Sequence, residues 1–130
     1  MNKAGEIDNL TKIIKPNIGV ITNISYAHIK NFKSLTEIAK AKSEMINNIA
    51  EDGKIILNRD DDYFDFIKKI ALRKNINIIS FSKKNSLSDI YIKKIISKNN
   101  NYKIFINIKN FTKSFLIKKN LYPYLHNILA

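Results

Sequence analysis

Three short runs of branched apolar residues alternate with two amphipathic segments, and this alternation constrains the fold more than any other feature. The runs are Asn17–Ile24, Lys54–Asn58 and Ile76–Phe81. Runs of this length and composition are typical of strands that are buried on both faces of a parallel sheet. Helices are predicted between them, from Ser34 to Asn48 or Ile49 and over Asp61–Arg73. Strand, helix, strand, helix, strand in this order predicts parallel units with right-handed crossovers.

Two local signals support the predicted helices. Ser34 followed by Glu37 is a capping box, in which each residue satisfies a free backbone N–H group at the start of a helix. An earlier amphipathic segment, Glu6–Lys15, has its apolar residues at helical spacing and is ended by Pro16.

The second half of the chain has a different pattern. Asp89–Ser97, Tyr102–Ile108 and Thr112–Lys118 are strand-like segments joined by short Asn/Lys turns, which predicts an antiparallel meander packed beside the parallel sheet. Pro123 interrupts this pattern, and His126–Ala130 resembles the first turn of a helix. The prediction is therefore an α/β fold, mostly parallel with flanking helices, plus an antiparallel meander.

The composition excludes several classes of protein. In 130 residues there is room for one domain, there is no cysteine, and no apolar run approaches the ~20 residues of a membrane span. No secretory signal is present either, so we expect a cytoplasmic protein. The net charge is +12, but Lys outnumbers Arg 21 to 2, and proteins that read nucleic acids depend on the planar fork of arginine. Solvated lysines that reflect a general drift toward Ile, Lys and Asn explain the charge better.

Lys42 is the most informative single residue. With Leu35 set at zero and about 100° per residue, Lys42 lies at about 340°, in the middle of the apolar stripe of its helix. Desolvation of an amine on this face lowers its pKa and makes it available as a nucleophile, also toward carbon dioxide. The alternative is that the stem of Lys42 covers apolar surface while its head reaches water.

Other polar residues follow the predicted strands, where open α/β sheets bind their ligands. His28 lies in the loop after the first strand and is able to hold a metal or to orient a phosphate. Asn58 and Asp60 follow the second strand and are candidates to contact magnesium or a ribose. The alternatives are a loop histidine bonded to backbone and an Asp60 or Asp61 that caps the next helix.

Several of these segments occur in the order and spacing of a known family. The stretches are Met1–Ile7 (MNKAGEI), Gly19–Ile24 (GVITNI), Ala27–Ile29 (AHI), Phe32–Leu35 (FKSL), Ile38–Glu44 (IAKAKSE), Asn58–Asp61 (NRDD) and His126-Asn127 (HN). On these stretches the first 60 residues of the chain resemble the central domain of the Mur ligases, of the MurF type; from about 64 to 121 only the strand layout supports the resemblance.

The resemblance implies an ATP-dependent ligase that joins D-alanyl-D-alanine to UDP-N-acetylmuramoyl-tripeptide through an acyl phosphate. It implies that His28 and a carbamylated Lys42 hold Mg²⁺ and act in catalysis. His126 and Asn127 are expected near the adenine of ATP, with Asn58 and Asp60 as further nucleotide contacts. Asn2 and Glu6 are expected on the substrate side.

The chain departs from the family pattern in ways that predict a fragment truncated at both ends. The GKT-type phosphate loop, the N-terminal domain and the C-terminal domain are missing, and Ala130 stands where the family has a second asparagine. We expect 1–121 to be part of the central domain and 122–130 to begin the following helix. Such a chain would depend on the missing domains and be inactive alone. The alternatives are a non-catalytic binding or regulatory module with the same fold and, ranked last, a basic nucleic-acid-binding protein.

Overall fold

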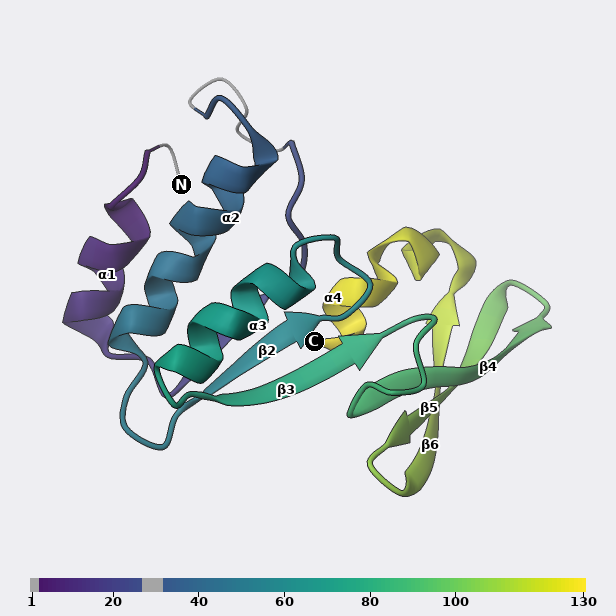
Figure 1. Ribbon diagram of the computed structural model, residues 1–130. Helices are drawn as coiled ribbons and strands as arrows, with labels where there is room; N and C mark the ends of the chain where they lie inside the picture. The colour runs from purple at the N-terminus through teal and green to yellow at the C-terminus, as the bar shows by residue number, and fades with distance from the viewer. Residues whose placement is uncertain (1–2, 27–31) are drawn as a thin grey trace.

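The computed structural model describes residues 3–26 and 32–130, which form one six-stranded sheet with helices on both faces (Figure 1). The strands lie side by side in chain order, β1 to β6. The fold class predicted from the sequence is confirmed. The elements in chain order are α1 (Glu6–Ile14), β1 (Ile18–Ile21), α2 (Leu35–Ser43), the 3₁₀ helix η2 (Glu44–Asn48), β2 (Lys54–Asn58), α3 (Phe64–Arg73), β3 (Asn77–Ser82), β4 (Ile90–Lys98), β5 (Asn101–Ile108), β6 (Phe111–Lys118), the 3₁₀ helix η3 (Lys119–Tyr124) and α4 (Leu125–Leu129).

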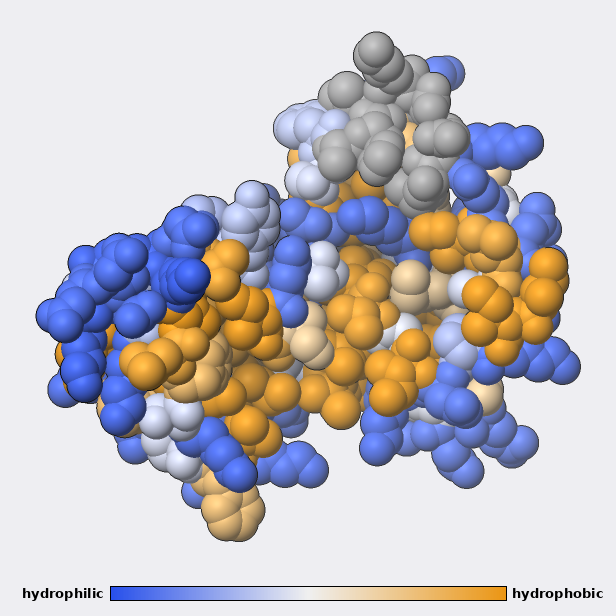
Figure 2. All heavy atoms as spheres, turned by 180° about the vertical axis from the view of Figure 1, so that it is seen from behind, coloured by the Kyte–Doolittle hydropathy of each residue, from blue (hydrophilic) through white to orange (hydrophobic). Residues whose placement is uncertain are grey.

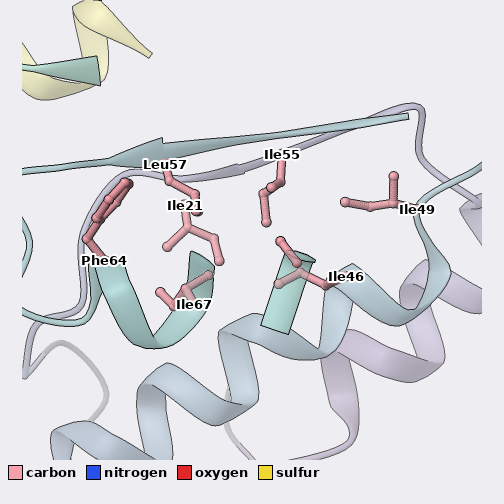
Figure 3. Close-up of a cluster of buried hydrophobic side chains, with 8 residues drawn as sticks. Ile21, Ile46, Ile49, Ile55, Leu57, Phe64 and Ile67 are labelled. Atoms are coloured by element: carbon pink, nitrogen blue, oxygen red, sulfur yellow. The ribbon is translucent and has the colours of Figure 1, made fainter. Parts of the chain in front are cut away.

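The first three strands are parallel and carry the main core. Side chains from β1, β2, α3 and the end of η2 point toward one another beneath the sheet (Figure 3). Helix α1 buries no side chain fully and packs outside this layer, against η2. The buried members of the core are Ile21, Ile46, Ile49, Ile55, Leu57, Phe64, Ile67 and Ala71.

The sequence predicts the start of α2 better than its end. The capping box is confirmed at its start, because Ser34 Oγ accepts the N–H of Glu37 at 3.2 Å. The reciprocal bond is displaced by one residue, since Glu37 Oε2 accepts the N–H of Lys33. The helical segment ends at Asn48, as predicted, but only the part up to Ser43 is α-helical, and the last five residues tighten into the 3₁₀ helix η2. Ser43 Oγ bonds back to the carbonyl of Ala39, a bond that competes with regular helix geometry.

Two other predicted elements are too long, and both errors have a physical cause. Strand β1 ends at Ile21 instead of Ile24, because the side chains of Asn58 and Asp61, at and just beyond the end of β2, bond to the backbone groups that follow Ile21. Helix α3 begins at Phe64 instead of Asp61, because the Asp61 carboxylate holds the N–H of Tyr63 in a turn before the helix.

The predicted meander is confirmed, but it extends the parallel sheet instead of packing beside it. Strand β4 runs parallel to β3 and shares only two residue pairs with its carboxyl end, Phe81–Ile90 and Ser82–Tyr91. Asp89 Oδ2 clamps this junction by accepting Ser80 N–H at 2.8 Å and Ser80 Oγ at 2.7 Å. Burial acts to raise the pKa of the Asp89 carboxyl, but these hydrogen bonds outweigh it and the pKa is lowered.

The meander has a core of its own. Strands β4, β5 and β6 pair antiparallel in sequence, with a bulge between Ile92 and Lys94. Ile104, Ile117 and Leu125 of α4 are buried together beneath it. The final residues of the chain therefore pack on the meander, while the predicted division at residue 121 stays a prediction.

The face of the parallel strands opposite to the main core is only partly covered. Ile18 and Val20 of β1 point to this face and are 58% and 42% exposed. Seen from behind, apolar side chains form an open area across the middle of the molecule (Figure 2). Among residues 3–26 and 32–130, no helix has the length and hydrophobicity to cross a membrane.

Candidate active site

The carboxyl ends of β1, β2 and β3 meet at one edge of the sheet, and most of the predicted site residues come from there. Thr22 to Ile24 follow β1, Asn58 to Asp61 end and follow β2, and Ser82 ends β3. Parallel strands place their carboxyl ends together, so residues separated in the sequence by 36 positions are in hydrogen-bond contact.

Lys42 reaches this edge from α2. Its side chain is half-buried, and its Nζ atom donates to the carbonyl oxygen of Asn23 at 2.7 Å. Desolvation by burial lowers the pKa of the Lys42 amine, and the nearby Asp61 carboxylate opposes this shift only in part. The amine is therefore held at the end of β1 in a state that loses its proton more easily than an exposed lysine.

Asp61 connects the end of β1 to the start of α3. Its Oδ2 atom accepts the N–H of Ile24 at 2.6 Å, and its Oδ1 atom accepts the N–H of Tyr63 at 2.9 Å. The backbone carbonyl of Asp61 also accepts the N–H of Phe64. The sequence indicated a helix-capping role for Asp60 or Asp61, and this prediction is wrong: the N-cap of α3 is Tyr63, no side chain caps the helix, and Asp61 instead holds the turn before it. The bridge to Ile24 was not predicted, because no local pattern reveals a bond across 37 positions.

Asn58 and Asp60 hold the three strand ends together. The Asn58 side-chain amide donates to Thr22 O at 2.9 Å, and Asn58 Oδ1 accepts the N–H of Asp60. Asp60 Oδ1 accepts Ser82 Oγ at 2.5 Å, and Asp60 Oδ2 accepts the N–H of Lys83 at 2.6 Å. Both side chains thus have partners within the protein, and their predicted contacts with a nucleotide stay predictions.

His126 approaches the same edge from α4. The Nδ1 atom of His126 is buried and has no hydrogen-bond partner among the described residues. Burial and the nearby Lys83 ammonium lower the pKa of the His126 imidazole, and Asp60 acts in the opposite direction. The ring is therefore predominantly neutral near pH 7. Asn127, the next residue, is exposed.

Three predicted site residues do not belong to this described group. His28 and Asn2 lie outside the described residues, so their placement is not part of the structure. Glu6 is the first residue of α1, in the helical layer outside α2. Glu44, which no sequence pattern singled out, serves this layer: its carboxylate accepts the N–H groups of Gly5 and Asp8, where α1 has no side-chain cap of its own.

The described residues do not form a magnesium site by themselves. Within 3–26 and 32–130, no three histidine or acidic side chains come together in a way that could hold a metal ion. Asp60 and Asp61 lie at the carboxyl ends of the strands, where a metal site is expected, but their oxygens already accept hydrogen bonds from the protein.

The fold and the polar edge define an α/β domain of the class that binds ligands beyond the carboxyl ends of its parallel strands. The model of the Mur ligase middle domain matches residues 1–129, and the chain belongs to the Mur ligase family.

Relatives with known names are much longer than this chain. The UDP-N-acetylmuramoyl-tripeptide–D-alanyl-D-alanine ligase of Buchnera aphidicola subsp. Baizongia pistaciae is 39% identical over 110 residues, which are 84% of this chain and 23% of that protein. The UDP-N-acetylmuramate–L-alanine ligase of Borreliella afzelii is 39% identical over 84 residues, 65% of this chain and 18% of that protein. The chain thus spans less than a quarter of either relative.

Solved structures that resemble this chain are also much longer than it. One crystal structure of MurF from Acinetobacter baumannii superimposes with a TM-score of 0.82 and 26% identity, over 99% of this chain and 27% of that chain. MurF from Thermotoga maritima, solved in complex with ADP, has a TM-score of 0.74 over 90% of this chain and 26% of that chain. At 20% identity the second comparison supports the fold alone.

Proposed function

We propose that this chain is part of the ATP-binding middle domain of a peptidoglycan precursor ligase that joins D-alanyl-D-alanine to UDP-N-acetylmuramoyl-tripeptide. The family match and the names of the Buchnera and Acinetobacter relatives support the reaction class. The observation that carries the proposal to this chain's own residues is the Lys42 amine, held at the carboxyl end of β1 beside Asp61.

In the proposed reaction, the terminal carboxylate of the peptide attacks the γ-phosphorus of ATP and ADP leaves. The amine of the dipeptide then attacks the acyl phosphate, an amide bond forms, and phosphate leaves. A half-buried cation such as Lys42 stabilises negative charge that develops at this edge of the sheet, because few water molecules screen it.

A second state of Lys42 is part of the proposal. The ammonium first loses a proton, and the neutral amine then adds to carbon dioxide and releases a second proton, so that a cation becomes an anionic carbamate. We propose that this carbamate and His28 are the magnesium ligands of the complete site. The described residues do not form that site without them.

The nucleotide is proposed to lie between the strand ends and α4. The neutral His126 ring, with its unpartnered Nδ1 atom, and the exposed Asn127 side chain offer hydrogen-bonding groups to an adenine there. Adding L-alanine to UDP-N-acetylmuramate is the second candidate reaction, because the Borreliella afzelii relative with that name is also 39% identical.

Activity assays distinguish these possibilities, and they use the protein in the form that its cell produces. The protein is incubated with ATP and Mg²⁺ and with either substrate pair, and both ADP release and product mass are measured. We expect the product of the tripeptide and D-alanyl-D-alanine. Product from UDP-N-acetylmuramate and L-alanine alone selects the second candidate reaction, and nucleotide binding without product from either pair selects a non-catalytic module.

Two lysine variants connect the activity to the proposed site. Lys42→Ala is expected to lower turnover by at least about a hundredfold, the usual effect of losing one group that stabilises transition-state charge. Lys40→Ala is the matched control, because Lys40 lies on the same helix and is exposed. Equal turnover in the two variants refutes the role of Lys42. The 130-residue chain on its own is expected to form no product.

A further inference from the structure

Positive charge is concentrated in the last third of the chain. Residues 90–130 contain eight lysines and no acidic residue, whereas all eleven acidic residues lie among the first 89. A general drift of composition toward lysine does not explain this asymmetry, because such a drift does not remove acidic residues from one segment only. The segment consists of the meander, η3 and α4.

The strand register places four of these lysines on one face of the meander, which we call the outer face. Successive rows across β4, β5 and β6 bring together side chains that point away from the Ile104–Leu125 core. The rows are Lys98, Asn101 and Lys118; Ile96, Lys103 and Leu116; and Lys94, Phe105 and Ser114. The bulge between Ile92 and Lys94 brings Lys94 into register with Phe105.

Apolar side chains are exposed among these lysines. Leu116 and Ile96 flank Lys103 and are 60% and 39% exposed. In Figure 2 the meander lies on the left, where hydrophilic and apolar side chains are both at the surface.

We propose that the outer face of the meander docks on an anionic lipid bilayer. Lysine is a compact, strongly hydrated charge, and it is attracted to a diffuse negative surface without needing the bidentate geometry of arginine. The exposed Leu116 and Ile96 side chains supply apolar contact at the headgroup level. The absence of acidic side chains from 90–130 removes the groups that anionic lipids would repel.

The same face is poorly suited to nucleic acid. Residues 90–130 contain no arginine. On this face the Lys103 ammonium lies 5.2 Å from the centre of the Phe105 ring. The Phe105 ring is therefore occupied by a lysine instead of being free to stack on a base.

Vesicle binding tests the proposal. The protein as its cell makes it is sedimented with vesicles of phosphatidylcholine alone, or of phosphatidylcholine mixed with phosphatidylglycerol, at low and high salt. We expect binding only to the anionic vesicles and release at high salt. Failure to bind anionic vesicles at low salt overturns the proposal, and it leaves the ligase proposal untouched because that assay uses soluble substrates.

Two matched triple variants distinguish binding through the outer face from an effect of the protein's overall charge. Changing Lys94, Lys103 and Lys118 together to Gln should lower the partition coefficient by roughly a hundredfold, at about fivefold for each lysine. Changing the exposed Lys54, Lys69 and Lys74 to Gln removes the same charge from the parallel half and should lower it only a few-fold. Equal losses in the two triple variants overturn the proposal.

The apolar contribution and the nucleic-acid alternative are tested with the same preparations. Leu116→Ser should weaken vesicle binding while its salt dependence is retained. Tighter binding of a single-stranded oligonucleotide than of anionic vesicles, lost in the outer-face triple variant, assigns the surface to nucleic acid and overturns the lipid proposal. Far-ultraviolet circular dichroism checks that each variant is folded.

Discussion

Replacing Asp61 by Asn tests whether one carboxylate fixes the geometry of the candidate site. In the structure the two oxygens of Asp61 accept the N–H groups of Ile24 and Tyr63, at 2.6 and 2.9 Å. An asparagine has one acceptor oxygen, and its NH₂ group would face one of these two N–H donors. At least one partly buried N–H group therefore loses its partner.

The size of the effect follows from the hydrogen bonds that are lost. A hydrogen bond to a charged group contributes about 1.5–3 kcal/mol, and an unsatisfied donor costs about 1–3 kcal/mol. Asp61→Asn should therefore lower the free energy of unfolding by about 2–3 kcal/mol. The variant also removes the carboxylate that opposes the shift of Lys42, so the pKa of the Lys42 amine should fall further.

Urea unfolding followed by circular dichroism measures the first effect. Asp62→Asn is the matched control, because Asp62 is exposed, adjacent and equally charged, and a surface change of this kind stays within about 0.5 kcal/mol. The second effect is measured by the pH dependence of Lys42 carbamate formation from ¹³C-labelled bicarbonate, by NMR. Equal stabilities of the two variants, together with an unchanged carbamate titration, would refute this account of Asp61.

Three further predictions concern proton binding and backbone packing. The pKa of Lys42 is lowered from 10.5, so the folded state binds fewer protons than the unfolded state as the pH approaches 10.5. The free energy of unfolding should therefore rise with pH in this range, and Lys42→Gln should flatten this rise in urea titrations. The pKa of His126 is lowered from 6.5, so thermal stability should fall as the pH drops below 6.5 and fall less in His126→Gln. Gly53→Ala should cost about 2–3 kcal/mol in urea unfolding, because its new methyl group meets the backbone oxygens of Ala50 and Asn17 at 2.7 and 2.8 Å. Gly19→Ala should cost only about 1 kcal/mol, since it meets the flexible end of a methionine side chain at 3.0 Å and an isoleucine methyl group at 3.1 Å; equal costs for the two would contradict this explanation.

The sequence predicted the elements well because their signals are local. The strand Lys54–Asn58 has the predicted bounds, and Ser34 caps the helix that carries Lys42. The helical spacing also placed Lys42 correctly on the apolar side of α2, since its side chain is half-buried. These features depend on residues within one or two turns of each other, where period and capping are readable from sequence.

The site could be predicted only as a region. That polar residues gather at the carboxyl ends of the strands follows from parallel topology, but the bonds among them do not. Asp61 to Ile24 and Asn58 to Thr22 span 37 and 36 positions, and only the packed sheet brings these pairs together. The same long-range bonds caused the errors at the end of β1 and the start of α3. The roles of Lys42, His126 and Asn127 in a reaction remain predictions.

The narrow junction between β3 and β4 has a consequence for how this domain can change in evolution. The two halves of the sheet share two residue pairs between β3 and β4 and the Asp89 clamp, and each half has its own set of buried side chains. Substitutions in the two cores should therefore act additively, since no residue belongs to both. Insertions in the β4–β5 or β5–β6 hairpin should likewise leave the strand ends around Lys42 in place. The meander is thus free to acquire new surfaces while the edge that holds Lys42 stays constant.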